Sequence, residues 1–142
     1  MRIALPFLLA LLLVPAAASA ADPIPTPKPV FFASGSSRGT VGGHLQRGEH
    51  DLYSLKAFSG QVMTVNVTAP DDNIAFEIYE PGTTFSRDAN GDLVFSGKSL
   101  HAPAEGEDTT RFKGRLPSRG TYIIAVASTR GGARYSMDIR LD

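Results

Sequence analysis

Two arginines occur in a short glycine-containing segment near the C-terminus, Thr129-Arg130-Gly131-Gly132-Ala133-Arg134, between two runs of alternating apolar residues. A guanidinium group is always charged and pairs with a carboxylate through two parallel hydrogen bonds. Gly-Gly is typical of a hairpin turn, so the local sequence predicts a hairpin loop here. Two interpretations are open: a solvated turn, or a presented cationic pair that contacts the carboxylates of a partner.

The sequence shows no pattern that is typical of an enzyme active site. The three histidines, His44, His50 and His101, lack the spacing of a metal site, and there is no cysteine to complete one. No Gly-x-Ser-x-Gly motif occurs. The adjacent carboxylates Asp71 and Asp72 are expected to diverge in a turn and to stay ionised, which suits neither acid nor base catalysis. We therefore expect neither catalytic residues nor a cofactor.

The segment Asp88-Ala89-Asn90-Gly91-Asp92 has the spacing of acidic oxygens found at the start of an EF-hand calcium loop. The match ends at Leu93, where the sharp turn requires glycine, and at Ser99, where a bidentate glutamate is required. Asn90-Gly91 predicts instead a tight type I′ hairpin turn.

Residues 1–20 have the features of a secretory signal peptide: Arg2, an apolar run from Leu8 to Val14, and Ala18-Ser19-Ala20 before the expected cleavage. A membrane anchor needs about 20 unbroken apolar residues, and Pro15 ends this run early. We expect a protein that is exported to the periplasm or secreted, without a membrane anchor. Because the chain has no cysteine, neither disulfides nor lipidation at a mature N-terminal cysteine is available to it.

The chain beyond residue 20 has the size of one domain and is nearly neutral. The full sequence has 14 Lys and Arg, of which Arg2 lies in residues 1–20, so the chain beyond residue 20 has 13 basic and 14 acidic residues. Nucleic-acid-binding domains and basic membrane-surface proteins normally carry a clear positive charge, so this balance argues against both classes. The sequence does not specify the oligomeric state.

Prolines alternate with other residues through the segment 21–29. This pattern predicts an extended polyproline II spacer before a single domain at 30–142. A docking motif for an SH3-type domain is the alternative, but that class of partner is cytoplasmic.

Apolar and polar residues alternate in five runs beyond Val30, with turn residues such as Ser59-Gly60 and Pro81-Gly82 between them. No window shows apolar residues at helical spacing. The pattern predicts an all-β fold, an antiparallel β-sandwich of about eight strands. Residues 97–108, with the acidic cluster Glu105, Glu107 and Asp108, are expected to form a long solvated loop. The five runs are Tyr53 to Ala57, Gln61 to Thr68, Ile74 to Tyr79, Tyr122 to Val126 and Tyr135 to Leu141.

These segments resemble the bacterial periplasmic inhibitors of g-type lysozyme over almost the whole domain. The matching motifs include Asp51-x-Tyr53-x-x-x-Ala57-x-x-Gly60-Gln61, Leu116-Pro117-x-x-Gly120-x-Tyr122 and Thr129-Arg130-x-x-Ala133-Arg134. Much of the pattern is shared with the wider pre-peptidase C-terminal class of β-sandwich modules, and the two-arginine loop is the part that favours the inhibitors.

The resemblance implies a fold like that of the pre-peptidase C-terminal domain and a lysozyme, of the g type, as the protein partner. It further implies that loops at one end of the sandwich block the substrate cleft, with Arg130 first, Arg134 second, and Thr129, Tyr122 and His50 as further contact residues. The alternative is a non-catalytic binding module for envelope polysaccharide or for a secreted enzyme.

Overall fold

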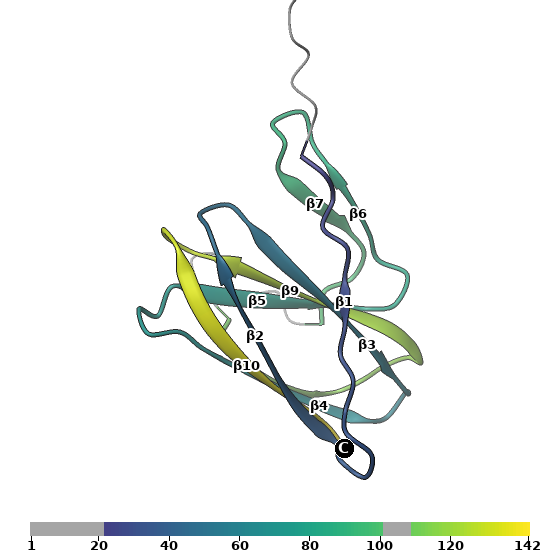
Figure 1. The fold of residues 1–142 in the computed structure, drawn as a ribbon. Coiled ribbons are helices and arrows are strands. Elements are labelled where there is room, and N and C mark those ends of the chain that lie inside the picture. The colour runs from purple at the N-terminus through teal and green to yellow at the C-terminus, as the bar shows by residue number, and fades with distance from the viewer. Residues whose placement is uncertain (1–21, 101–108) are drawn as a thin grey trace, which may run out of the picture.

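The computed structural model describes residues 22–100 and 109–142, and it confirms an all-β sandwich (Figure 1). Two four-stranded sheets pack face to face, and a two-stranded hairpin lies outside one of them. The two sheets together hold the eight strands that were expected, and the hairpin brings the number to ten. Neither described segment includes a helix with the length and apolar character that crossing a bilayer requires.

Strand order is set by pairings between segments far apart in the sequence. Sheet A has the order β1-β3-β9-β5, and sheet B has the order β2-β10-β4-β8. Every pairing is antiparallel except that of β1 with β3. Sheet A consists of β1 (Lys28–Pro29), β3 (His50–Ala57), β5 (Ile74–Tyr79) and β9 (Gly120–Ser128), and sheet B of β2 (Arg38–Leu45), β4 (Val62–Thr68), β8 (Arg111–Arg115) and β10 (Ala133–Leu141).

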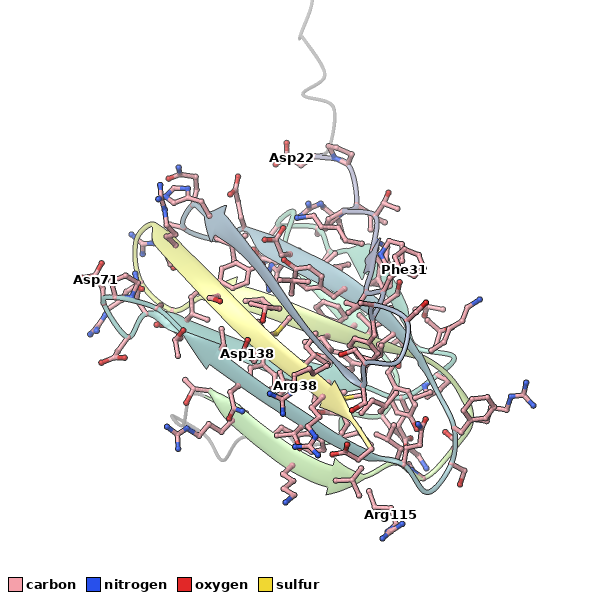
Figure 2. The ribbon with its side chains drawn as sticks, turned by 60° about the horizontal axis from the view of Figure 1, so that its bottom comes forward. Asp22, Phe31, Arg38, Asp71, Arg115 and Asp138 are labelled. Carbon is pink, nitrogen blue, oxygen red and sulfur yellow. The ribbon has the colours of Figure 1, made fainter. Side chains whose placement is uncertain are left out.

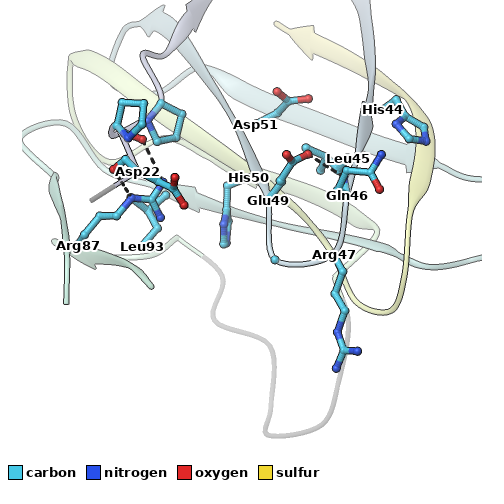
Figure 3. Close-up of a pocket in the computed structure, with 13 residues that line it drawn as sticks. Asp22, His44, Leu45, Gln46, Arg47, Glu49, His50, Asp51, Arg87 and Leu93 are labelled. Atoms are coloured by element: carbon cyan, nitrogen blue, oxygen red, sulfur yellow. Dashed lines mark hydrogen bonds between the residues drawn. The ribbon is translucent and has the colours of Figure 1, made fainter. Parts of the chain in front are cut away.

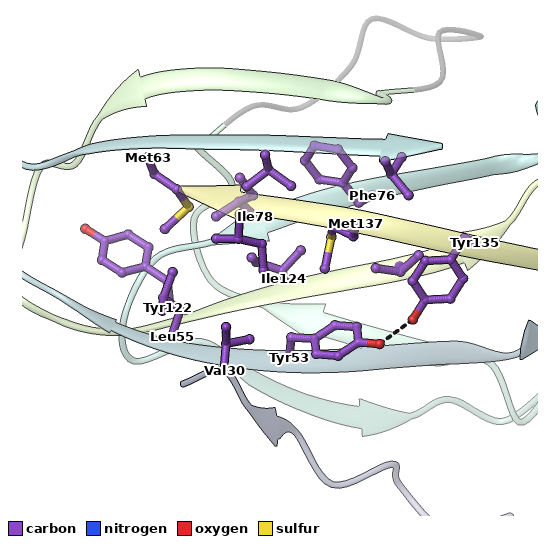
Figure 4. Packing of buried hydrophobic residues seen from close by; sticks show 14 of the residues in the cluster. Val30, Tyr53, Leu55, Met63, Phe76, Ile78, Tyr122, Ile124, Tyr135 and Met137 are labelled. Atoms are coloured by element: carbon purple, nitrogen blue, oxygen red, sulfur yellow. Dashed lines mark hydrogen bonds between the residues drawn. The ribbon is translucent and has the colours of Figure 1, made fainter. Parts of the chain in front are cut away.

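Alternation of apolar and polar side chains along the strands builds the core between the sheets. β10 alternates strictly between buried and exposed residues, so Tyr135, Met137 and Ile139 point inward. The centre of the core contains Met63 and Met137, both fully buried (Figure 4). In a chain without cysteine, this apolar packing holds the two sheets together.

The predicted hairpin between β9 and β10 is wrong. β9 pairs with β3 and β5 in sheet A, whereas β10 pairs with β2 and β4 in sheet B. Residues 129–132 therefore carry the chain from one sheet to the other. Turn residues between two apolar runs indicate a reversal of the chain, but they do not specify whether the flanking strands hydrogen-bond to each other.

The predicted hairpin at Asn90-Gly91 is present, formed by β6 (Thr84–Arg87) and β7 (Leu93–Ser96). Its turn is longer than the expected two residues, because Arg87 pairs with Leu93 and leaves 88–92 as the loop. Asp88 Oδ1 accepts hydrogen bonds from the backbone N–H groups of Asn90 and Asp92, both at 2.9 Å. This carboxylate oxygen thus stabilises a wider turn than glycine alone would favour.

The β6–β7 hairpin forms a third layer on the outer face of sheet A. Apolar side chains of the hairpin pack on a buried patch of that face, and the ring of Tyr79 stacks on Phe95 with centroids 4.6 Å apart. β9 is consequently buried on both faces from Tyr122 to Val126. The hairpin contributes Phe85, Leu93 and Phe95, and sheet A contributes Leu52, Tyr79, Ile123 and Ala125.

The proline-rich segment is attached to the domain, in contrast to the expected free spacer. Lys28–Pro29 pair in parallel with Tyr53 and Ser54 as strand β1. Farther upstream, the Arg87 guanidinium donates hydrogen bonds to the carbonyl oxygens of Asp22 (2.9 Å) and Pro23 (3.0 Å). Proline has no N–H to donate, but its carbonyl and those of its neighbours still accept.

Part of the expected 97–108 loop is also paired with the domain. Ser99 forms an isolated bridge with Tyr79, and the Leu100 N–H donates to the Ile78 carbonyl at 2.8 Å. The acidic cluster Glu105, Glu107 and Asp108 lies outside the described residues.

A series of hydrogen bonds crosses the sandwich, from a buried pair of tyrosines to the exposed Lys28. The Tyr53 hydroxyl lies 2.6 Å from the Tyr135 hydroxyl (Figure 4), which in turn donates to Asp51 Oδ2 at 2.6 Å. The second oxygen of Asp51 accepts from Lys28 Nζ at 2.7 Å. Burial raises the pKa of the Tyr135 hydroxyl far above its ordinary value, so this group remains a donor. This series of hydrogen bonds links β1, β3 and β10.

Replacing Tyr135 by Phe should lower the free energy of unfolding by about 1.5–3 kcal/mol, measured by urea denaturation. The variant keeps the ring but leaves Asp51 Oδ2 and the Tyr53 hydroxyl without this partner. Tyr53→Phe, which removes only a bond between neutral groups, should cost about 1 kcal/mol. Equal losses in the two variants would contradict a special role for the Asp51 bond.

Candidate partner-binding site

Three loops lie together at one end of the sandwich, which we call the loop end. They are the β2–β3 loop (46–49), the β4–β5 loop (69–73) and the β9–β10 loop (129–132). Strand register places them there, because Leu45 pairs with Ala133, and Ile74 pairs with Ser128. A Cβ on Gly132 would lie 3.7 Å from Gln46 Oε1, so the first and third loops are in close proximity.

Asn73 fixes the conformation of the β9–β10 loop. Its side-chain Nδ2 donates to the backbone carbonyls of Arg130 (3.0 Å) and Gly132 (2.9 Å), and the backbone carbonyl of Asn73 accepts from the Thr129 N–H at 2.9 Å. Asn73 is only 4% exposed, so these bonds are shielded from water. Gly131, at φ +64°, supplies the left-handed residue that the turn requires. The loop is therefore ordered before any partner arrives.

Arg130 is exposed at the tip of this loop. One guanidinium nitrogen, Nη2, donates to the Asp71 carbonyl at 3.1 Å, so the side chain rests on the β4–β5 loop. This single bond leaves most of the five guanidinium donors available to a partner. Thr129 is exposed next to it, and its side chain faces solvent beside the ordered backbone.

Arg134 belongs to strand β10 and not to the loop where it was expected. It is exposed on the outer face of sheet B, directly opposite His44 of β2. A shallow hollow of about 450 Å³ lies beside it, with Ala69 and Pro70 in its wall. Arg134 thus presents a cation next to an apolar recess, an arrangement suited to a side chain with an aliphatic and an acidic part.

The β2–β3 loop adds a third arginine at the same end. The Gln46 N–H donates to Glu49 Oε2 at 2.7 Å and the Glu49 N–H donates to the Gln46 carbonyl at 3.1 Å, which closes a tight turn. Gly48, at φ +80°, completes it. Arg47 is exposed at the tip and projects away from the sandwich (Figure 3).

His50 adjoins the loop end but lies on the outer face of sheet A, whereas Arg134 lies on the outer face of sheet B. His50 begins β3, with its ring 6.1 Å from that of Phe95 in the β6–β7 hairpin. It lines a hollow of about 620 Å³ between the β2–β3 loop, the N-terminal segment and Arg87 (Figure 3). Burial lowers the pKa of His50 below 6.5, and the positive charge of Arg87 lowers it further. The expected grouping of His50 with Arg130 and Arg134 is not observed.

Tyr122 is a core residue, so its predicted role in partner contact is wrong. It has no exposed surface, and it lies on β9 near the end opposite to the loops, where it pairs with Leu55. Its hydroxyl donates to the Ser118 carbonyl at 2.7 Å and accepts from the Ser118 N–H at 3.2 Å. The motif Leu116-Pro117-x-x-Gly120-x-Tyr122 therefore describes a buried tyrosine corner.

Within the part of the chain that the structure describes, no group of three His, Asp or Glu side chains could hold a metal ion. The loop end instead presents Arg47, Arg130 and Arg134 on ordered backbone, which is the chemistry of a surface that recognises carboxylates.

Solved structures of similar fold include inhibitors of lysozyme. The periplasmic inhibitor of g-type lysozyme from Aeromonas hydrophila matches with a TM-score of 0.61 and 23% identity, over 82% of this chain and 96% of that one. The corresponding inhibitor from Salmonella Typhimurium matches with a TM-score of 0.56 and 23% identity, over 82% of this chain and all of that one. This chain has their fold.

The fold is also shared with the pre-peptidase C-terminal domain of a collagenase from Bacillus anthracis. That match has a TM-score of 0.50 and 12% identity, and it covers 84% of this chain and 99% of that domain. The sequence predicted an antiparallel β-sandwich with a fold like that of the pre-peptidase C-terminal domain, and both predictions are confirmed. No family model matches the sequence, and no curated protein matches it at the level of sequence.

Two residues of the loop end were missed by reasoning from sequence. Asn73 follows Asp71-Asp72 in what looks like an ordinary polar turn, and nothing in its neighbourhood indicates bonds to residues 57 and 59 positions away. Arg47 precedes Gly48-Glu49, and a glycine beside a polar side chain is a local signal of a tight turn. The structure shows that Glu49 accepts the hydrogen bond from the Gln46 N–H that closes this turn.

Asn73→Ala should loosen the β9–β10 loop and lower the free energy of unfolding by about 1–3 kcal/mol, because two shielded carbonyls lose their donor. Hydrogen exchange should accelerate at the Thr129 amide, and urea denaturation gives the loss of stability. Asn66→Ala, at an exposed position of β4, is the matched control and should change stability by less than about 0.5 kcal/mol. Unchanged exchange at Thr129 would show that Asn73 does not hold the loop.

His50 should make the protein less stable in mild acid. Its folded pKa lies below the unfolded value of 6.5, so the unfolded chain binds the proton more readily, and the free energy of unfolding falls as pH drops below about 6.5. In His50→Gln this contribution disappears, so denaturation curves between about pH 7.5 and pH 5.5 should show a smaller pH dependence than in the parent. If the free energy of unfolding depends on pH equally in the parent and in His50→Gln, His50 is not the source of the loss of stability in acid.

Proposed function

We propose that this protein is a periplasmic or secreted inhibitor of lysozyme, of the g type, that blocks the enzyme's substrate cleft with its loop end. The observation that carries the proposal is the ordered β9–β10 loop, which presents Arg130 at its tip with its backbone bonded to Asn73. Similarity of fold to proteins described as periplasmic inhibitors of g-type lysozyme supports it.

The chemistry of the target explains why an arginine is suited to this role. Hydrolysis of a glycosidic bond uses carboxyl groups that flank the scissile linkage in a concave site. A guanidinium inserted between them satisfies their negative charge and occupies the space of the glycan. Double-mutant cycles at other interfaces give about 1.5–7 kcal/mol for such close charge pairs, so one arginine can dominate the affinity.

Preorganisation of the loop adds to this effect. Ordering an interface loop on binding costs free energy, and the bonds from Asn73 and from Ser128 Oγ to the Gly131 carbonyl (2.5 Å) have already removed that cost. Arg134 and the hollow beside Pro70 then offer a second contact on the sheet B side. Inhibition of this kind requires no catalytic group in the inhibitor itself.

Arg130→Ala should weaken binding to g-type lysozyme at least about tenfold, because the variant loses a charge pair and keeps the backbone bonds of the loop. The protein purified after expression of the full chain is titrated against lysozymes of the g, c and i types, with cell-wall hydrolysis and calorimetry as readouts. Arg119→Ala, which removes an exposed arginine at the opposite end of the sandwich, is the control and should leave binding unchanged.

One result would overturn the proposed function, and another would overturn only the assignment of its contact loop. Absence of inhibition of all three lysozyme types would favour the alternative of a non-catalytic binding module, since the collagenase domain shares the fold. Inhibition that is unaffected by Arg130→Ala would retain the function but exclude this loop as the contact.

A further inference from the structure

The outer face of sheet B, which we call the cationic face, extends from Arg134 at the loop end toward the opposite end of the sandwich and is strongly charged. The strand pattern points alternate side chains of β2, β4, β8 and β10 to solvent. Five of the chain's 14 Lys and Arg lie on it beyond Arg134, and Asp138 and the C-terminal Asp142 are the acidic residues among the described ones there. The five are Arg38, Arg111, Lys113, Arg115 and Arg140, with Arg38, Arg115 and Asp138 marked in Figure 2.

Strand register aligns three of these cations in one row across the sheet. Arg38 pairs with Arg140, Arg140 with Thr64, and Thr64 with Lys113. Like charges directly opposite each other on neighbouring strands destabilise a sheet. Only Arg140 has its charge neutralised, by Asp142 at 2.5 Å, and among the described residues neither the Arg38 guanidinium nor the Lys113 amine has an ion-pair partner. We therefore do not expect this row of cations to stabilise the fold.

A hollow of about 390 Å³ lies in the middle of the cationic face. Its walls combine charged groups from Arg38 and Arg140 with the short polar side chains of Thr40, Thr64 and Asn66. The one carboxylate there, Asp138, accepts a hydrogen bond from Thr40 Oγ1 at 2.5 Å. Hydroxyl and amide groups between cations match a ligand that has many hydroxyls and regularly spaced negative charges.

We propose that the cationic face binds a linear anionic polysaccharide. Three strand spacings, about 14 Å, separate β2 from β8, so the row of cations spans several sugar units. Insertion into a membrane requires exposed apolar side chains, but the exposed large apolar residues of the described chain, Ile24, Phe31, Phe58 and Val94, all lie outside sheet B. The site is independent of the proposed inhibition of lysozyme.

The test uses alginate, a linear polyuronate, as the probe, and the protein purified after expression of the full chain. Affinity electrophoresis and calorimetry at low salt should show binding to alginate and none to neutral dextran, and the affinity should fall as salt is added. The double variant Arg38→Gln/Lys113→Gln should weaken alginate binding about tenfold. Its thermal midpoint should stay unchanged or rise, because the variant relieves repulsion between like charges.

Lys56→Gln is the matched control, because Lys56 is exposed on β3 in sheet A and its loss changes net charge without altering the cationic face. It should bind alginate like the parent. Lysozyme inhibition should be the same in the double variant and the parent. An equal loss of alginate binding in Lys56→Gln, binding to phosphatidylglycerol vesicles without binding to alginate, or no binding to alginate at all would each overturn the proposal.

Discussion

The hydrogen-bonded chain from Lys28 through Asp51 to Tyr135 and Tyr53 is the constraint on which the arrangement of this sandwich depends. Apolar packing brings two sheets together but does not fix how they slide past each other. The bond from Tyr135 on sheet B to Asp51 on sheet A needs one relative position of the sheets. Gly43 allows it, because a Cβ there would come 2.6 Å from Asp51 Oδ2. A partly buried carboxylate with two partners thus supplies specificity that the core alone lacks.

The position of the loop end follows from this constraint. β10 starts at Ala133, two residues before Tyr135, and the β9–β10 loop connects the same two sheets that Tyr135 and Asp51 hold in register. Asn73 then attaches the loop to the β4–β5 connection. Arg130 is therefore placed by interactions of buried polar groups on both sides of the sandwich, although its own side chain is exposed.

The local sequence predicted the strands that have one apolar and one polar face. It did not predict strand pairing or burial where these depend on contacts between residues far apart in the sequence. The run Ile74 to Tyr79 is strand β5, and Gln61 to Thr68 matches β4 to within one residue. β2 showed little alternation because glycines replace side chains at Gly42 and Gly43, where Tyr135 and Asp51 approach closely. Pairing of β9 within sheet A and the burial of Tyr122 depend on partners far along the chain. Of the predicted site residues, Thr129, Arg130 and Arg134 are exposed at the loop end. His50 adjoins the β2–β3 loop but lies on the outer face of sheet A, and Tyr122 is buried near the opposite end.

The prolines of residues 22–29 have a consequence for the behaviour of the protein at high concentration. β3 would be an open edge of sheet A without β1, and an open edge offers unpaired N–H and C=O groups to strands of other molecules. β1 covers that edge with only two paired residues, and Pro29, which has no N–H, is one of them. On this side the sheet therefore ends in a very short strand that offers other chains one N–H donor fewer. A protein without disulfides gains protection from edge-to-edge aggregation by the same prolines that were predicted to form a spacer.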